Sequence, residues 1–317
     1  MWSDILLLIV GLVALVKSAD MLVAGASAIA KNNNVSDITV GLTIVAFGTS
    51  APELVVNVLA AYQDHQGIVF GNVIGSNNFN LFVILGVTAL IAPVAVKSRT
   101  VWLEIPISFA ATVLLLILVN GFLGAGILTL SKLDGFVLMT GFAGFMIYVS
   151  RQLKADTVST EDSQRKSSSL KSWRFVVLGL FGLVLGGKLL VDHAVAIARD
   201  MGVSEQMIGL TIVAAGTSLP ELATSVMAAV RGKNDIAIGN VIGSNIFNIL
   251  FVLAVSAIIR SLDYNAQLNR DLVLLLIGTV ILFAAMFIGR KMRLDRWQGM
   301  ILLMIYSGYL YFSIRNA

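Results

Sequence analysis

Ten apolar runs divide the 317-residue chain, and each approaches the length that crosses a lipid bilayer. A membrane-spanning helix takes about 20 apolar residues. The runs lie at approximately 4–29, 36–62, 67–92, 100–119, 133–150, 173–198, 205–230, 236–259, 271–289 and 298–314. The pattern predicts an all-α polytopic membrane protein with ten transmembrane helices. The first run follows a segment without positive charge, so we interpret it as a helix rather than a signal peptide.

The composition excludes a water-soluble protein. Hydrophobic residues make up 57% of the chain and charged residues 13%, with a mean hydropathy of +0.90, so the lipid bilayer is the expected partner. The 22 basic and 18 acidic residues give a net charge of +4, and the basic residues form short clusters between apolar runs. This distribution does not favour a nucleic-acid partner. The chain has no cysteine, which excludes disulfides, thiolate metal sites and cysteine nucleophiles. We expect a monomer.

A polar linker at 151–172 separates five spans from five, which divides the chain into halves at 1–150 and 173–317. With the N-terminus outside, the inner loops carry fifteen Lys and Arg residues and the outer loops five. The positive-inside rule then places the linker in the cytoplasm and both termini on the extracellular or periplasmic side of the cell (inner) membrane.

The two halves are repeats of one another. Residues 41–86 align without a gap on residues 209–254, with 26 of 46 positions identical and a constant offset of 168. Five spans separate the two copies, and because five is odd the second copy must enter the membrane from the opposite side. This predicts two inverted five-helix repeats, a plan of many secondary transporters in which the substrate binds where the repeats meet.

Each copy contains the motif Gly-Thr-Ser-x-Pro-Glu within an apolar run, at 48–53 and 216–221. A charged group in the middle of a membrane costs about 2.5–3.5 kcal/mol on insertion scales. Two acids at equivalent positions, Glu53 and Glu221, therefore indicate a bound cation or a proton.

The prolines of these motifs expose backbone oxygens. Pro52 and Pro220 lack an N–H and clash with the preceding turn, which disturbs the carbonyls around Ala46 and Ala214. Hydroxyls three and four residues before each glutamate share its helical face. These hydroxyls belong to Thr49, Ser50, Thr217 and Ser218.

A second repeated motif, Gly-Asn-Val-Ile-Gly-Ser-Asn-x-Phe-Asn, adds Ser76 and Asn80 in one copy and Ser244 and Asn248 in the other. The combined set offers carboxylate, hydroxyl, amide and carbonyl oxygens without sulfur or imidazole. Such a set suits Ca²⁺ and Na⁺ rather than zinc or copper. The motifs therefore predict a hard-cation site.

Other interpretations stay open. The polar groups could bond helix to helix without binding an ion, or they could line a cation channel. An intramembrane hydrolase using Ser50 or Ser218 is disfavoured, because His65 and His193 do not align between the repeats and are expected at the membrane interface.

Asp20 and Lys188 occupy equivalent positions in the two repeats but carry opposite charges. We expect them to form an intramembrane pair or to serve as interface anchors, and we place neither of them in the cation site.

The two repeated motifs resemble the paired alpha-repeats of the cation/calcium exchanger superfamily, and the whole chain is similar to a prokaryotic sodium/calcium exchanger. Calcium/proton exchangers usually carry Gly-Asn-x-x-Glu instead, which these motifs lack. The resemblance implies that Glu53 and Glu221 are central calcium ligands, assisted by Thr49 and Thr217. It further implies sodium ligands and a central ring made by Ala46, Ser50, Ser244, Ala214, Ser218, Ser76, Asn80 and Asn248.

In potassium-dependent members an acid replaces the last of these residues, so Asn248 indicates potassium-independent exchange; coupling to H⁺ or K⁺ is the alternative. No cofactor is expected, only the transported ions Ca²⁺ and Na⁺. An empty site with two negative charges would cross a low-dielectric intermediate at high cost, whereas a site neutralised by Ca²⁺ or by two Na⁺ would not. The expected function is therefore obligatory antiport rather than enzymatic catalysis.

The inverted repeat can be tested with single cysteines in this cysteine-free chain. A cysteine at Gln66 should react with an impermeant thiol reagent added from outside, and one at its repeat equivalent Asn234 should react from inside. Labelling of both from the same face would contradict opposite orientations.

Overall fold

The computed structural model describes residues 2–33, 35–121, 128–156, 169–202 and 214–315. Six of its helices are continuous: α1 (Trp2–Asn32), α7 (Ile105–Val119), α8 (Lys132–Asp156), α9 (Ser169–Asp200), α15 (Asn269–Ala285) and α16 (Arg296–Arg315). Each lies within or around one of the apolar runs, as the hydropathy pattern predicts.

The remaining helical runs are interrupted. Each consists of short α-helices joined by a break or by a π-helical turn (η). The first run consists of α2 (Asp37–Val40), η1 (Gly41–Val45), α3 (Ala46–Thr49) and α4 (Ala51–Tyr62), and the second of α5 (Gln66–Asn78), η2 (Phe79–Ile84) and α6 (Leu85–Ile91). In the second half, α11 (Ala214–Gly216) and α12 (Leu219–Val230) form one run, and α13 (Asn234–Phe247), η5 (Asn248–Val252) and α14 (Leu253–Ile259) form the other. A π-helical turn, η3 (Thr100–Glu104), leads directly into α7. A short 3₁₀ turn, η6 (Ala266–Leu268), precedes α15.

Seven helices of the described chain are long and apolar enough to cross a membrane, and the bent run from Asp37 to Tyr62 makes up to eight. The protein is therefore an all-helical, polytopic membrane protein. Residues 203–213, the first part of the seventh expected span, lie outside the described residues. Helix α8 continues to Asp156 and α9 begins at Ser169, so both extend into the expected linker at 151–172, of which residues 157–168 lie outside the described residues.

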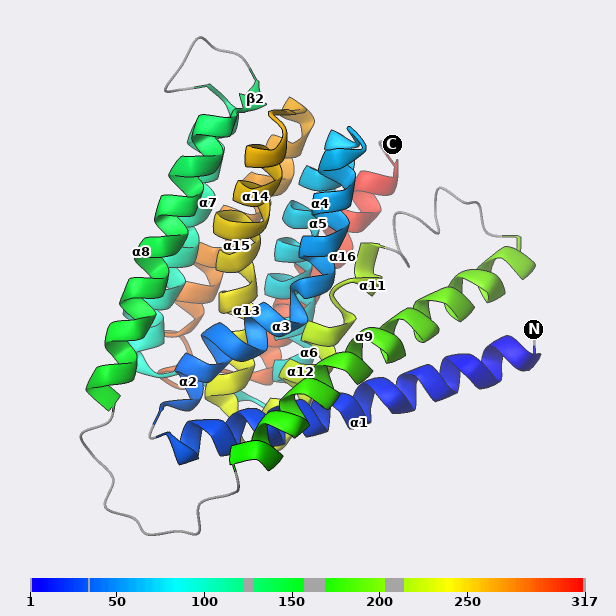
Figure 1. Cartoon of the computed structure of the whole chain (residues 1–317), viewed down its shortest axis with the longest axis vertical. Helices are drawn as coiled ribbons and strands as arrows, with labels where there is room; N and C mark the ends of the chain where they lie inside the picture. Colours follow the sequence, from blue (N-terminus) through cyan, green and yellow to red (C-terminus); the bar gives the residue numbers. More distant parts are fainter. Residues whose placement is uncertain (1, 34, 122–127, 157–168, 203–213, 316–317) are drawn as a thin grey trace.

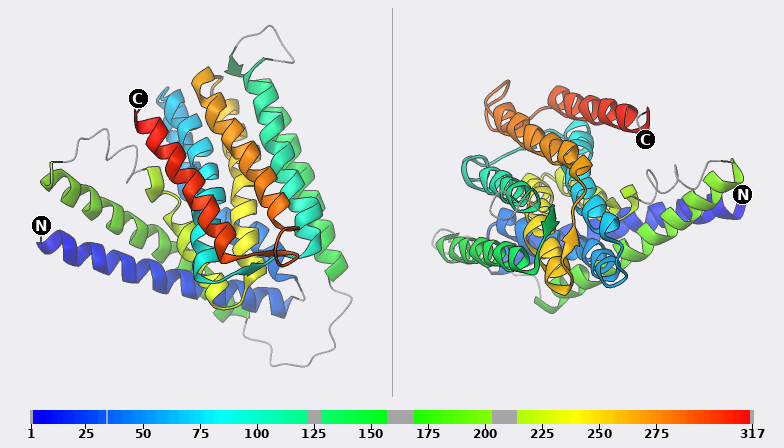
Figure 2. Two further views of the ribbon diagram at one scale, coloured as in Figure 1. Left: turned by 180° about the vertical axis from the view of Figure 1, so that it is seen from behind. Right: turned by 90° about the horizontal axis from the view of Figure 1, so that it is seen from above.

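Helices α1 and α9 form an antiparallel pair that leans away from the upright bundle of the other long helices (Figures 1 and 2). Glycines allow their backbones to approach closely. A Cβ on Gly11 would lie 2.8 Å from the backbone nitrogen of Leu190, and one on Gly179 would lie 2.7 Å from that of Leu22. These two contacts are equivalent under the 168-residue offset.

Apolar side chains lie on the outside of the molecule and many polar side chains lie inside, as expected for a protein surrounded by lipid. Large apolar side chains on the outer faces of α1 and α9 are exposed, among them Leu6, Val13, Val177 and Phe181. The buried interior, in contrast, holds many of the polar side chains near the two repeated motifs. Helix α13 lies at the centre, since every residue from Ile236 to Phe247 is buried.

Two short antiparallel pairings join the loops. Strand β1 (Val94–Ala95) pairs with β4 (Arg293–Leu294), and β2 (Thr129–Leu130) pairs with β3 (Leu262–Asp263). Strands β1 and β3 are equivalent under the 168-residue offset, yet they lie at opposite ends of the bundle. The β2–β3 pair is at the upper end in Figure 1, and the β1–β4 pair is at the lower end in Figure 2.

The turn between α12 and α13 is tied to three neighbouring segments by ion pairs. Arg231 contacts Asp20 of α1 at 2.6 Å, Lys233 contacts Asp37 of α2 at 3.0 Å, and Lys97 contacts Asp235 at 2.6 Å. Asp20 therefore pairs with Arg231 on this turn, so the first alternative, an intramembrane Asp20–Lys188 pair, was wrong. The second alternative, that the two residues are interface anchors, stays a prediction.

Candidate cation site

Both Gly-Thr-Ser-x-Pro-Glu motifs break their helices, as the prolines predict. Helix α3 ends at Thr49, α4 begins at Ala51, and the run bends by 46°. Pro52 and Pro220 lie in the first turns of α4 and α12, where a missing N–H leaves no hydrogen bond unmade. Glu53 and Glu221 lie in the same first turns, where the helix dipole favours negative charge.

The two motifs meet across the repeats. Ser50 donates its hydroxyl hydrogen to Oε1 of Glu221, with an oxygen–oxygen distance of 2.9 Å, and Ser218 donates to Oε1 of Glu53 at 3.3 Å. The Ser50 hydroxyl also lies 2.9 Å from that of Ser244. Both glutamates are 1% exposed. Each carboxylate is therefore held by the serine of the opposite repeat.

The threonine hydroxyls point their hydrogens at asparagines. Thr49 donates to Oδ1 of Asn240 at 3.1 Å, and Thr217 donates to Oδ1 of Asn72 at 3.4 Å. A hydroxyl that donates outward keeps its lone pairs free for another partner. Both threonines can thus offer oxygens to a cation beside the glutamates.

Asn80 and Asn248 lie in or at the start of π-helical turns, whose extra residue per turn is frequent at functional sites. Each uses its amide N–H to bond an asparagine of the other repeat: Asn80 bonds Oδ1 of Asn245 at 3.0 Å, and Asn248 bonds Oδ1 of Asn77 at 3.1 Å. The side-chain oxygens of Asn80 and Asn248 (Oδ1) have no hydrogen-bond partner within the described part of the chain.

The oxygens of the remaining predicted residues differ in whether they already accept a hydrogen bond. Ser76 is buried, and its oxygen is unpartnered in the described chain. The Ala46 carbonyl is not bare, because it accepts from the Ser50 N–H at 3.0 Å. The Thr49 hydroxyl lies 3.4 Å from it, farther than from Oδ1 of Asn240, which takes the one hydroxyl hydrogen. Ala214 begins α11, and its side chain lies outside the described features.

Buried oxygens without a hydrogen-bond partner among the described residues mark the centre of this region. They include Glu53 Oε2, Glu221 Oε2, Asn80 Oδ1, Asn248 Oδ1 and Ser76 Oγ. Buried polar atoms normally find partners. Unpartnered oxygens also occur at Asn78, Thr88 and Glu104, but the five named above combine both motif carboxylates with neutral oxygens of the two repeats, which favours a positive ligand. The described residues hold no cluster of three or more His, Cys, Asp or Glu. The donor set fits a hard cation bound largely by neutral oxygens.

Four asparagines at this site were not singled out from the sequence: Asn72, Asn77, Asn240 and Asn245. All four are letters of the second repeated motif and are identical between its two copies. That identity was the available signal, but it does not distinguish a residue that faces an ion from one that holds a ligand.

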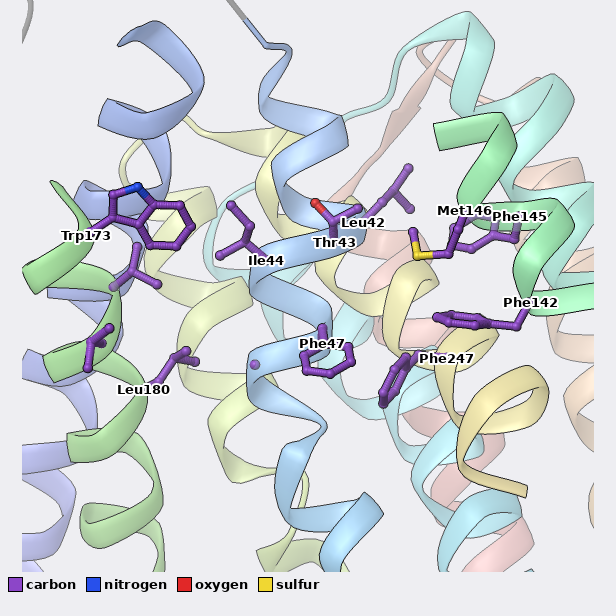
Figure 3. Close-up of a pocket in the computed structure, with 13 residues that line it drawn as sticks. Leu42, Thr43, Ile44, Phe47, Phe142, Phe145, Met146, Trp173, Leu180 and Phe247 are labelled. Atoms are coloured by element: carbon purple, nitrogen blue, oxygen red, sulfur yellow. The ribbon is translucent and has the colours of Figure 1, made fainter. Parts of the chain in front are cut away.

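An apolar cavity of about 400 Å³ lies beside the site, between α9, α8 and the helix that carries Phe47 (Figure 3). Its lining is aromatic and aliphatic except for Thr43, whose hydroxyl bonds the Thr39 carbonyl at 2.6 Å. Without charged groups in its lining, this cavity does not suit a cation.

The fold and this buried centre of carboxylate, hydroxyl and amide oxygens define a polytopic membrane protein of the transporter class. The model of the family described as "Sodium/calcium exchanger protein" matches residues 3–151 and 171–315. The chain therefore belongs to the sodium/calcium exchanger family.

Individual relatives match over nearly the full length. The protein CaxA of Alkalimonas amylolytica is 41% identical over 312 residues, covering 96% of each chain. The sodium/calcium exchanger MaX1 of Methanosarcina acetivorans is 33% identical over 341 residues, covering 97% of each chain. A solved structure of the sodium-calcium exchanger NCX_Mj matches with a TM-score of 0.82 and 32% identity, covering 97% of each chain.

The site predicts which buried acids matter for cation binding. Glu53→Gln or Glu221→Gln should weaken Ca²⁺ binding by the purified protein by more than about 100-fold, since removing one charged partner of a buried pair costs about 3–5 kcal/mol. Isothermal titration calorimetry measures this.

Glu104→Gln is the matched control. Glu104 is also fully buried, but it accepts from Tyr148 and Gln152 of α8 at 2.6 and 2.9 Å, outside the two motifs. It should bind Ca²⁺ like the wild type. Unchanged binding in both motif variants would refute the assignment.

Proposed function

We propose that this protein is a secondary active antiporter that exchanges Na⁺ for Ca²⁺ across the cell membrane. The observation that carries the proposal is the pair of buried glutamates, each held by a serine of the other repeat, with one carboxylate oxygen apiece left unpartnered within the described structure. Membership of the sodium/calcium exchanger family supports the same ions.

In this proposal, Glu53 and Glu221 bind Ca²⁺ centrally together with Thr49 and Thr217. Sodium binds on either side of that level. The sodium ligands and the asparagines that complete the ring are Ala46, Ser50, Ser244, Ala214, Ser218, Ser76, Asn80 and Asn248. The free oxygens of Ser76, Asn80 and Asn248 favour this assignment, whereas the Ala46 carbonyl already accepts the Ser50 N–H and has one lone pair left for an ion.

The chain in this proposal has ten spans in two inverted repeats, with both termini outside. The antiparallel packing of α1 on α9 favours inversion, since these helices occupy equivalent places in the two halves. So does the location of the equivalent strands β1 and β3 at opposite ends of the bundle (Figures 1 and 2).

Alternating access would come from movement of α1 and α9 against the helices that carry the site. Helix α9 contacts both helix breaks at glycines of the motifs: a Cβ on Gly48 would meet Leu180 at 2.5 Å, and one on Gly216 would meet Val191 at 2.6 Å. Displacement of α9 would therefore change the packing at both Gly-Thr-Ser-x-Pro-Glu motifs.

Charge balance makes the exchange obligatory. Two carboxylates are neutralised by one Ca²⁺ or by two Na⁺, and an empty site would keep an uncompensated charge in a low-dielectric environment. Asn80 and Asn248 are neutral, so the ring adds no third charge that would recruit K⁺. We therefore propose exchange without a potassium requirement.

The test is calcium uptake into vesicles that contain the purified protein. Sodium-loaded vesicles should take up Ca²⁺ at the same rate in potassium-free and potassium-containing medium, and choline-loaded vesicles should not take it up. Vesicles with Glu221→Gln are the control for leakage.

Three other outcomes would contradict the proposal. Uptake that is independent of internal sodium would indicate a channel. A strict need for K⁺ would show that Asn248 does not set the coupling ion. Uptake driven by a pH gradient alone would indicate H⁺ as the coupling ion.

A further inference from the structure

Asn77 of α5 and Asn245 of α13, equivalent residues of the two repeats, are bonded to each other in a reciprocal manner. The side-chain N–H of Asn77 donates to the backbone carbonyl of Asn245 at 3.2 Å, and the side-chain N–H of Asn245 donates to the backbone carbonyl of Asn77 at 3.2 Å. Both side chains are buried, at 0% and 3% exposure. This asparagine pair lies where the two repeats meet.

The direction of these bonds is fixed by chemistry. A backbone carbonyl only accepts, so each amide of the asparagine pair must turn its NH₂ group toward the carbonyl. The Oδ1 atoms then face the other way, toward Asn248 and Asn80. Those two residues have to present their own NH₂ groups, at 3.1 and 3.0 Å.

These bonds decide which atoms Asn80 and Asn248 can offer to a cation. With their NH₂ groups engaged, Asn80 and Asn248 have only their Oδ1 atoms left to offer from the side chain, and these atoms are buried without a partner in the described chain. A flipped Asn248 would set its oxygen against Oδ1 of Asn77 and turn two N–H donors toward the site. Donors there would repel a cation.

The threonine ligands follow the same rule. Asn57 donates to the Val69 carbonyl at 3.2 Å and accepts from Asn72 at 2.7 Å, and Asn72 in turn accepts from Thr217. In the other repeat, Asn240 donates to the Glu221 carbonyl at 3.3 Å and accepts from Thr49. In each case a backbone carbonyl begins a chain that draws the hydrogen away from the ligand oxygen.

We propose that Asn77 and Asn245 are positioning residues that hold the amides of Asn248 and Asn80 with their oxygens toward the transported cation. They act by accepting the amide hydrogens, so that the site presents lone pairs and no N–H donors. This inference rests on the proposed cation site and adds the residues that set the polarity of its neutral ligands.

The test is Ca²⁺ affinity by isothermal titration calorimetry on purified full-length variants. Asn77→Leu removes the acceptor and frees the Asn248 amide to rotate, and it should weaken Ca²⁺ binding at least tenfold. Asn77→Asp keeps the size and the acceptor but loses the donor. It should bind Ca²⁺ no more weakly than the wild type, because Asn248 remains oriented.

Asn78→Leu is the matched control. Asn78 is the neighbouring buried asparagine, but its amide donates to the Asp271 carbonyl of α15 at 3.0 Å rather than to an asparagine of the other repeat. It should keep wild-type affinity even if its melting temperature falls as far as that of Asn77→Leu. Affinity thereby separates positioning from general packing.

Two results would overturn the inference: wild-type affinity in Asn77→Leu, or affinity in Asn77→Asp more than threefold weaker than wild type. The second result would mean that binding depends on the bond from Asn77 to the Asn245 carbonyl and not on the acceptor that Asn77 offers to Asn248. This measurement tests the inference even if Asn77→Leu does not fold. Absence of Ca²⁺ binding by the wild type would instead refute the proposed function.

Discussion

Two carboxylates buried at the junction of the repeats impose the constraint on which the rest of this structure depends. Glu53 and Glu221 are 1% exposed, and each is held by a serine of the opposite half. Charge at this depth is costly unless it is compensated. The helix breaks, which place both acids in first turns, and the serine hydroxyls that donate to them reduce this cost. A bound cation would remove the remainder.

The segments around the two glutamates provide neutral oxygens and close packing beside these buried charges. The π-helical turns at Asn80 and Asn248 place amides across the repeat boundary, and the asparagines behind them accept the amide hydrogens. Glycines let α1 and α9 pack closely on each other, and the glycines of the two motifs let α9 pack closely on both helix breaks. The helices that we propose to move during transport therefore lie beside the acids.

Much of this was predictable from the sequence, for physical reasons. Long apolar runs predict the spans, because such runs are unfavourable in water. Proline predicts the helix breaks, because it disrupts a helix interior. Two acids in apolar runs predict the site, because a buried charge is costly without a ligand. The roles of Asn77 and Asn245 were not predictable, since they depend on which partner each amide meets across the repeats. The partner of Asp20 was missed for the same reason: Arg231 is distant in sequence and reaches it only through the fold.

The central claim is that the doubly charged site cannot change access while it is empty. The direct measurement is release of Ca²⁺ from loaded vesicles containing the purified protein into a choline medium free of Na⁺ and Ca²⁺. The account predicts that Ca²⁺ stays inside until external Na⁺ or Ca²⁺ is added, and that release then begins at once. Steady release into the choline medium, at a rate comparable to that with sodium, would contradict it.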